Sequence, residues 1–250
     1  MAPVWRLVWS FLFIDPMIVI STVCCGSIGI IVSLFEKRGR AQIKLARAWA
    51  GSILRFAGVR VTVEGLKKID PQGSYVFVAN HLSYMDTPVV LHNIPMQFRF
   101  LAKQGLFQIP FLGTHLTSAG HIAVPRDDPR GAIKSLSRAA ETIREHGISV
   151  LIFPEGGRSP DGALHPFKEG AAYIAIKAGV PVVPVALIGT RDVMAMGSAT
   201  IHSGKEVRLL IGDPIPTANL ILRDRHTLTD KLHEQILTMA EYTEVSDVWQ

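Results

Sequence analysis

The stretch Ser74-Tyr75-Val76-Phe77-Val78-Ala79-Asn80-His81-Leu82-Ser83-Tyr84-Met85-Asp86-Thr87-Pro88 joins an apolar run to a turn that carries a histidine and an aspartate. Residues 74–79 are mostly β-branched or aromatic and carry no charge, which is typical of a strand buried on both faces of a sheet. Functional side chains often follow the carboxyl end of such a strand. We therefore expect the fold to be organised around this strand and the functional site to lie where it ends.

His81 and Asp86 form a candidate acid-base pair, but only in an irregular turn. A regular helix through both residues would place their side chains about 140° apart around its axis. A carboxylate that accepts the Nδ1 proton would fix the tautomer of the imidazole and leave Nε2 free as a base. Read locally, the same residues also fit a histidine satisfied in a turn and an aspartate that caps the next helix.

The 250 residues suffice for one large domain or two small ones, and 48% of them are hydrophobic. The net charge of +5 favours an anionic partner such as a membrane surface, a phosphorylated substrate or nucleic acid. Cys24 and Cys25 are adjacent within an apolar run, which gives no disulfide framework, metal cluster or Cys-His pair.

The N-terminal segment indicates contact with lipid. Residues 17–35 carry no charge and follow Asp15-Pro16, a suitable helix start. A helix of about 19 residues at about 1.5 Å each approaches the hydrocarbon thickness of about 30 Å. A single span preceded by an interfacial helix and a helical hairpin in one leaflet both fit, whereas a cleaved signal peptide fits less well because Arg6 is its only basic residue before the apolar run.

A basic cluster follows this segment and predicts that the remaining chain lies on the cytoplasmic side of the membrane. From residue 40 to residue 57 the pattern is helical, with its cations on one stripe. We favour an interfacial helix whose cations face lipid head groups over an ordinary surface helix. The cluster comprises Lys37, Arg38, Arg40, Lys44 and Arg47, and Arg55 continues the stripe.

The remaining chain alternates short β-rich runs with helix-like segments. We expect an α/β fold, with a mixed, largely parallel central sheet covered by helices and preceded by a membrane-embedded helical segment. The composition changes near residue 36, so we divide the chain into a membrane-anchoring segment, 1–57, and a catalytic domain, 58–250. The expected strands are 60–63, 75–78, 98–101, 121–124, 150–153, 182–187 and 207–211, and the clearest later helices are 129–145, 168–177 and 228–242.

Four further stretches carry candidate functional residues. Gly120-His121-Ile122-Ala123-Val124-Pro125-Arg126 ends a strand with a guanidinium that suits phosphate, or that pairs with Asp127 or Asp128. Phe153-Pro154-Glu155-Gly156-Gly157-Arg158-Ser159-Pro160 is a glycine-rich turn that lets backbone amides approach an anion, or a simple turn with a Glu-Arg ion pair.

Leu101-Ala102-Lys103-Gln104 offers a lysine that binds phosphate or is simply solvated. The prolines of Gly179-Val180-Pro181-Val182-Val183-Pro184-Val185-Ala186 predict an edge strand or a strand start.

Four motifs follow one another along the chain: N-H-L-S-Y-M-D at residues 80–86, G-H-I-A-V-P-R ending at Arg126, F-P-E-G-G-R-S at 153–159 and V-P-V-V-P-V at 180–185. In this order and spacing they resemble the glycerolipid acyltransferase family, in particular the 1-acyl-sn-glycerol-3-phosphate acyltransferases. The resemblance covers residues 60–215. It implies His81 as general base, Asp86 as its orienting carboxylate, and Lys103, Arg126, Glu155, Gly156 and Arg158 in substrate binding. Gly157 departs from the family pattern, in which threonine is commoner.

The resemblance implies transfer of an acyl group from coenzyme A or acyl carrier protein to the 2-hydroxyl of lysophosphatidate, giving phosphatidic acid at a membrane. No cofactor, metal or nucleic acid is expected, and the partners are a lysophospholipid, an acyl thioester, an anionic membrane surface and, as one donor, acyl carrier protein. The alternatives are another lipid acceptor, an acyl-enzyme on Ser83, a metal-dependent hydrolase using His81, Asp86, His115 and His121, and a non-catalytic lipid-binding protein.

Overall fold

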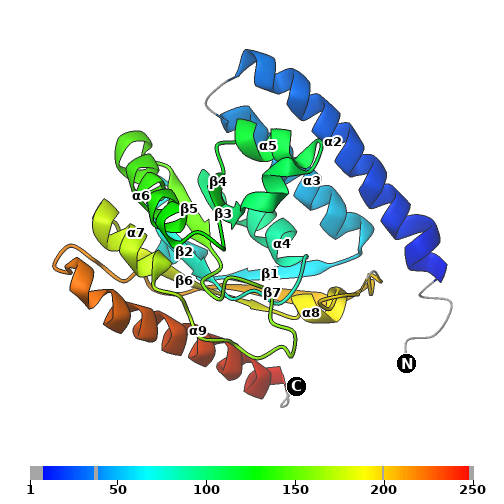
Figure 1. Cartoon of the computed structure of the whole chain (residues 1–250). Helices are drawn as coiled ribbons and strands as arrows, with labels where there is room; N and C mark the ends of the chain where they lie inside the picture. The colour runs from blue at the N-terminus through cyan, green and yellow to red at the C-terminus, as the bar shows by residue number, and fades with distance from the viewer. Residues whose placement is uncertain (1–7, 37–38, 199, 248–250) are drawn as a thin grey trace.

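The computed structural model describes residues 8–36, 39–198 and 200–247 and contains a seven-stranded sheet in the order β1-β7-β6-β2-β5-β3-β4 (Figure 1). The β6-β7 pair is antiparallel and every other neighbouring pair is parallel. All seven predicted strands are present, and the expected mixed, largely parallel sheet is confirmed. The strands are β1 (Arg60–Glu64), β2 (Val76–Ala79), β3 (Phe98–Lys103), β4 (Ile122–Val124), β5 (Ser149–Ile152), β6 (Val182–Ile188) and β7 (Glu206–Ile211).

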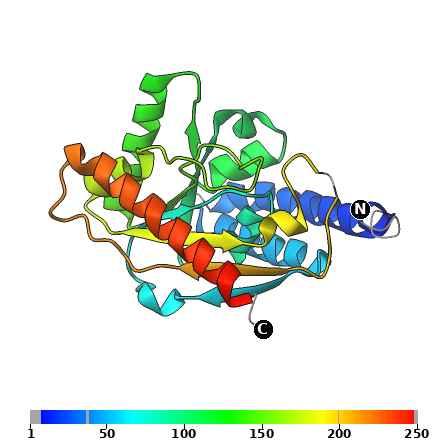
Figure 2. The same cartoon turned by 90° about the horizontal axis from the view of Figure 1, so that it is seen from below.

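Helices cover both faces of this sheet (Figures 1 and 2). One face packs against α3 (Arg40–Phe56) and α4 (Asp86–Asn93), and the other against α6 (Pro129–His146), α7 (Gly170–Ala178) and α9 (Arg225–Asp247). The remaining elements are η1 (Ser10–Ile14), α2 (Asp15–Phe35), η2 (Leu66–Lys68), η3 (Gln104–Gln108), α5 (Leu112–Ser118), α8 (Thr190–Val193) and η4 (Leu222–Asp224).

Strand β2 lies at the centre because its side chains enter both cores. Phe77 and Ala79 belong to the core beneath α3 and α4, whereas Val76 and Val78 belong to the core beneath α6, α7 and α9. All four side chains are fully buried. The uncharged, largely β-branched and aromatic run at 74–79 therefore contains the strand buried on both faces that the sequence predicted.

The apolar helix runs without a break from Ser10 to Phe35 through η1 and α2, and it is long enough to cross a bilayer. The expected helix start at Asp15-Pro16 is therefore wrong, and so is a hairpin of the two apolar stretches on either side of it. The helix lies alongside α3, as Figure 1 shows. The hydroxyls of Ser21 and Ser52 are 2.6 Å apart, and the Gln42 amide donates to the Gly29 carbonyl at 2.6 Å. The helix is thus attached to α3 along its length.

The predicted cationic stripe on α3 is wrong at one position. Arg47 donates hydrogen bonds to the carbonyl oxygens of Ile94, Pro95 and Met96, just past the end of α4. Carbonyls at a helix C-terminus lack intrahelical donors and carry partial negative charge, so they attract the guanidinium inward. Lys37 and Arg38 of the predicted basic cluster lie outside the described residues.

The expectation of an edge strand at the two prolines is also wrong. Strand β6 is central, with β2 and β7 as its neighbours. Pro181 precedes the strand, as a strand start requires, but Pro184 lies within it. Between the pairs Val185↔Ile211 and Val182↔Ile215, the β7 side contains one residue more than β6. The Val182 N–H faces the β7 side of the strand. Alternate residues of a strand point the same way, so an N–H at position 184 would also face β7. The extra residue already interrupts the hydrogen-bond ladder there, which is why a proline without an N–H is tolerated.

Candidate active site

The parallel strands β2, β5, β3 and β4 present their carboxyl ends at one edge of the sheet. His81 follows β2, Glu155 follows β5, Lys103 ends β3 and Arg126 follows β4. The edge is the expected location of a ligand site in such a sheet. The topology therefore brings to one edge the residues that the sequence placed after separate strands.

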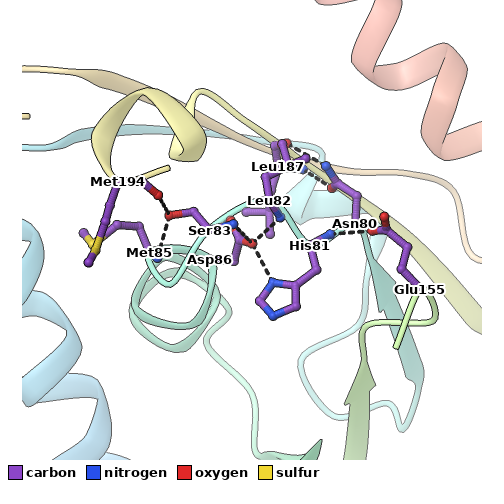
Figure 3. Close-up of polar contacts among 9 residues, drawn as sticks. All are labelled: Asn80, His81, Leu82, Ser83, Met85, Asp86, Glu155, Leu187 and Met194. Atoms are coloured by element: carbon purple, nitrogen blue, oxygen red, sulfur yellow. Dashed lines mark hydrogen bonds and ion pairs between the residues drawn. The ribbon is translucent and has the colours of Figure 1, made fainter. Parts of the chain in front are cut away.

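His81 and Asp86 are in contact. The chain between β2 and α4 is irregular from residue 80 to residue 85, and His81 Nδ1 lies 2.7 Å from Asp86 Oδ2 (Figure 3). The His81 side chain is 19% exposed and the Asp86 side chain 0%. Since Nδ1 faces the carboxylate, the remaining ring nitrogen, Nε2, is left to act on a substrate.

Asp86 also organises the turn itself. Its Oδ2 atom accepts the backbone N–H groups of Leu82 at 2.7 Å and Ser83 at 2.8 Å, while Oδ1 is buried without a hydrogen-bond partner in the described part of the chain. A buried carboxylate with a spare oxygen is costly unless it faces positive charge. The arrangement therefore suits an imidazole that becomes cationic when it takes a proton.

The backbone of His81 is held on both sides by the turn after β5. Its N–H donates to Glu155 Oε1 at 2.7 Å, and its carbonyl accepts the Ser159 N–H at 2.8 Å. The imidazole stacks on Phe153 with ring centroids 4.1 Å apart. Three different contacts therefore fix the position of His81 in addition to Asp86.

Glu155 faces the protein backbone. Its Oε1 accepts the His81 N–H and its Oε2 accepts the His165 N–H at 3.2 Å. Burial raises the pKa of its carboxyl group above the ordinary value, and the two N–H donors offset only part of this effect. The resemblance implied a role for Glu155 in acceptor binding, whereas these contacts assign its two oxygens to the loop. Sequence could not show this because the bonded residues are far apart along the chain.

Ser83 is buried and its hydroxyl is engaged. Ser83 Oγ donates to the Met194 carbonyl at 2.6 Å and accepts the Met85 N–H at 3.0 Å, and the residue is 0% exposed. A hydroxyl in this position fixes the turn to α8. Because the side chain is fully buried, this hydroxyl is not exposed to an incoming acyl group.

The cations at the edge differ in their surroundings. The Arg158 guanidinium carbon lies 3.3 Å from the centroid of the Tyr84 ring, and Arg158 Nη1 is buried with no hydrogen-bond partner among the described residues. Lys103 and Arg126 are exposed, and within the described chain Arg126 forms no ion pair with Asp127 or Asp128.

The glycine-rich turn also brings a lysine that the sequence interpretation missed. Gly156 has φ +75, and a Cβ there would lie 2.9 Å from Lys168 Nζ, whereas a Cβ on Gly157 would meet nothing within 4 Å. Glycine at 156 is thus favoured by the backbone conformation, whereas at 157 there is room for the threonine that is commoner in the family. The block P-F-K after the turn was the available signal for Lys168.

The histidines of the alternative metal site are engaged elsewhere. His121 Nδ1 accepts the Phe100 N–H at 2.9 Å, and His115 Nδ1 lies 3.1 Å from Gln42 Oε1. Burial lowers the pKa of both, that of His121 to about 3. Within the described residues, no group of three His, Cys, Asp or Glu side chains is arranged to hold a metal ion.

The fold and the site define an α/β domain with a His-Asp pair in contact beside cations at the carboxyl ends of its parallel strands. Residues 60–188 match the family described as Acyltransferase, and the chain belongs to this family. It is 38% identical over 186 residues to the chloroplastic 1-acyl-sn-glycerol-3-phosphate acyltransferase of Brassica napus, covering 74% of this chain and 53% of that one. It is 32% identical over 205 residues to the human 1-acyl-sn-glycerol-3-phosphate acyltransferase alpha, covering 81% and 72%.

The structure is similar to the crystal structure of the 1-acyl-sn-glycerophosphate (LPA) acyltransferase from Thermotoga maritima. The TM-score is 0.81 at 27% sequence identity, over 96% of this chain and 98% of that chain. The chain spans about half the length of the first plant relatives, 53% and 48%. Its N-terminal apolar helix, of which only 6% of the most apolar window is buried, associates the protein with membranes.

Proposed function

We propose that the protein transfers an acyl group from an acyl thioester to the 2-hydroxyl of lysophosphatidate, forming phosphatidic acid. The observation that carries the proposal is the His81 Nδ1 to Asp86 Oδ2 contact of 2.7 Å, which leaves Nε2 available as a base. The names of the human and Thermotoga maritima relatives support the same substrate class.

In the proposed mechanism His81 takes the proton from the acceptor hydroxyl as its oxygen attacks the thioester carbonyl. The thioester C–S bond breaks, the new ester bond forms, and the leaving thiolate takes the proton back from the His81 imidazolium, which regenerates the base. Asp86 stabilises the imidazolium that forms between these steps. General-base catalysis of this kind contributes about 10²- to 10⁴-fold. The engaged hydroxyl of Ser83 favours direct attack by the acceptor over an acyl-enzyme.

The acceptor phosphate is assigned to the cations at the sheet edge. Arg158 has a buried nitrogen without a partner in the described chain, and Lys103 and Arg126 are exposed at the ends of neighbouring strands. These groups would position the acceptor and leave proton transfer to His81. Gly156 allows the turn that carries Arg158 to come close to Lys168.

The membrane-anchoring segment is assigned to residues 1–57 and the acyltransferase domain to residues 58–250, on the cytoplasmic face. The attachment of α2 to α3 through Ser21, Ser52 and Gln42 supports a position of both helices in one leaflet, because a crossing α2 would carry α3 with it. Ala46, Ala50 and Ile53 of α3 are buried in the main core. The proposed anchoring segment and the acyltransferase domain thus differ in function but contribute side chains to one hydrophobic core.

The proposal is tested with the detergent-solubilised full chain. Lysophosphatidate, other lysophospholipids and glycerol 3-phosphate are each incubated with acyl-coenzyme A or acyl carrier protein, and free thiol and lipid mass are followed. Acylation of lysophosphatidate above the other acceptors is the expected result. Preferred acylation of another lysophospholipid would replace the acceptor, and no thiol release with any acceptor would refute the proposed activity.

A further inference from the structure

A second apolar surface lies between β3 and β4. Residues 104–118 contain no Asp, Glu, Lys or Arg, and this segment forms η3 and α5. Its large apolar side chains are exposed by 37% at Leu106, 46% at Ile109, 52% at Phe111 and 39% at Leu112. We call these four residues the α5 patch. A monomeric soluble surface seldom gathers so many large apolar side chains in seven residues.

The α5 patch is continuous with the membrane-associated helix α2. Phe111 Cβ lies 3.6 Å from the point where a Cβ on Gly26 would be, and α5 lies beside α2 in Figure 1. Val23 and Ile30 are three and four residues from Gly26, so they share its face of the helix, and they are 50% and 36% exposed. Apolar surface therefore extends from α2 across Phe111.

Hydrogen-bond contacts through Gln42 of α3 connect α5 with α2. His115 of α5 contacts Gln42 of α3 at 3.1 Å, and the same Gln42 donates to Gly29 of α2 at 2.6 Å. Phe111, with φ 64, is the non-glycine residue with positive φ in the described part of the chain. Such a conformation persists only where surrounding structure imposes it, and here it leaves the phenyl ring half exposed beside α2.

We propose that the α5 patch inserts into the interfacial region of the same lipid leaflet as α2. A bilayer is the occupant that the observations favour, because the patch has no charge, adjoins a membrane-associated helix and follows directly after the exposed cation Lys103. Cations beside an apolar surface are typical of segments that lie in the plane of an anionic membrane. The patch would thereby place the end of β3, and with it the acceptor cations, at the lipid surface.

The same contacts limit the depth of insertion. Gly26 lies near the middle of the apolar helix Ser10–Phe35, so a helix that crossed the bilayer would carry Phe111 towards its centre. The exposed amides of Gln104 and Gln108 would then lie in hydrocarbon, where an unpaired polar group is costly. An interfacial position leaves these amides in the head-group region and the α5 patch in the acyl boundary.

The test uses an environment-sensitive nitrobenzoxadiazole label in a Cys24→Ser, Cys25→Ser background of the full chain. Phe111→Cys carries the label on the α5 patch. Leu34→Cys carries it on α2, at a side chain that is 72% exposed. Ile133→Cys is the matched control on α6, at a side chain that is 56% exposed. The labelled proteins are mixed with vesicles of phosphatidylcholine and phosphatidylglycerol. Emission wavelength, quenching by aqueous iodide and quenching by doxyl-labelled lipid are recorded.

A label at 111 is expected to shift to shorter wavelength, to lose iodide quenching and to be quenched by doxyl lipid as strongly as the label at 34, while the label at 133 stays in water. A label at 111 that remains accessible to iodide overturns the proposal, whatever the label at 34 shows. As a second measurement, Phe111→Ser with Leu112→Ser should lower vesicle partitioning about tenfold or more, and Ile133→Ser should leave it unchanged. Unchanged partitioning of the double variant would count equally against the proposal. Neither readout requires acyl transfer, so the result is separate from that of the proposed function.

Discussion

Replacing Asp86 with asparagine should remove most of the turnover without removing the substrate site. Asp86 Oδ2 receives His81 Nδ1 and two backbone N–H groups at 2.7 to 2.8 Å, and its side chain is 0% exposed. Asparagine has nearly the same shape, and its carbonyl oxygen can still accept the two backbone donors. What it loses is the negative charge that stabilises the imidazolium of His81.

The size of the effect follows from that loss. Hydrogen bonds to a charged group contribute about 1.5–3 kcal/mol each, and the whole contribution of a positioned general base is about 10²- to 10⁴-fold. We expect kcat to fall about 10³-fold, equivalent to about 4 kcal/mol in the barrier. The KM for the acceptor should change by less than about threefold, because Asp86 does not contact the cations assigned to phosphate.

Steady-state release of free thiol, with each substrate varied in turn, measures the two parameters. Asp161→Asn is the matched control, because Asp161 Oδ1 likewise receives three groups, Ser159 Oγ, the Ala163 N–H and His165 Nε2, but lies in an exposed loop. It should keep kcat within about threefold. A kcat for Asp86→Asn within tenfold of the unchanged enzyme, or a loss confined to KM, would refute the role given to the His-Asp pair.

Three further results are expected. Glu155→Gln should lower kcat about 10- to 100-fold with little change in acceptor KM, since Glu155 acts through the His81 backbone; a large rise in KM alone would instead indicate direct acceptor contact. Ser83→Ala should keep kcat within about threefold while losing about 1–3 kcal/mol of stability in denaturant unfolding, and complete loss of turnover in a folded variant would revive the acyl-enzyme route. Burial holds the pKa of His121 at about 3, below its unfolded value of about 6.5, so below pH 6.5 the unfolded chain binds more protons and stability falls. The loss due to His121 should reach about 2 kcal/mol at pH 5, and unfolding midpoints that respond to pH in the same way in His121→Gln would contradict this assignment.

The strands of the fold were predictable from sequence because their local pattern and their tertiary environment agree. The run at 75–79 carries no charge and is buried on both faces in the structure. The failure came at Pro184, where a missing N–H is tolerated in a central strand because an extra residue on the neighbouring strand already interrupts the ladder. An irregularity on one strand cannot be recognised from the sequence of another.

The candidate site was predictable only in part, for a related reason. The contact of His81 with Asp86 depends on five residues of local chain, and the requirement for an irregular turn could be stated in advance. The contact of His81 with Glu155 joins residues on different strands, and the stacking of Arg158 on Tyr84 joins two separate motifs. Sequence order indicated that these motifs belong together but not which atoms meet.

Asn80 explains how a central strand can end in the turn that the chemistry needs. Where β2 leaves the sheet, its backbone no longer bonds to β6, but the Asn80 side chain donates to the Leu187 carbonyl at 2.9 Å and accepts the Leu187 N–H at 2.7 Å (Figure 3). The amide thus continues the ladder by one step after the main chain has turned away, so no buried backbone group of Leu187 is left unpaired. His81 is released from the sheet at that point. Glu155 accepts its N–H, and Asp86 accepts the N–H groups of Leu82 and Ser83, which the irregular turn would otherwise leave without partners. The carboxylate oxygen that closes the turn is therefore the same one that receives His81 Nδ1, which is why the site cannot be separated from the end of the strand on which it is built.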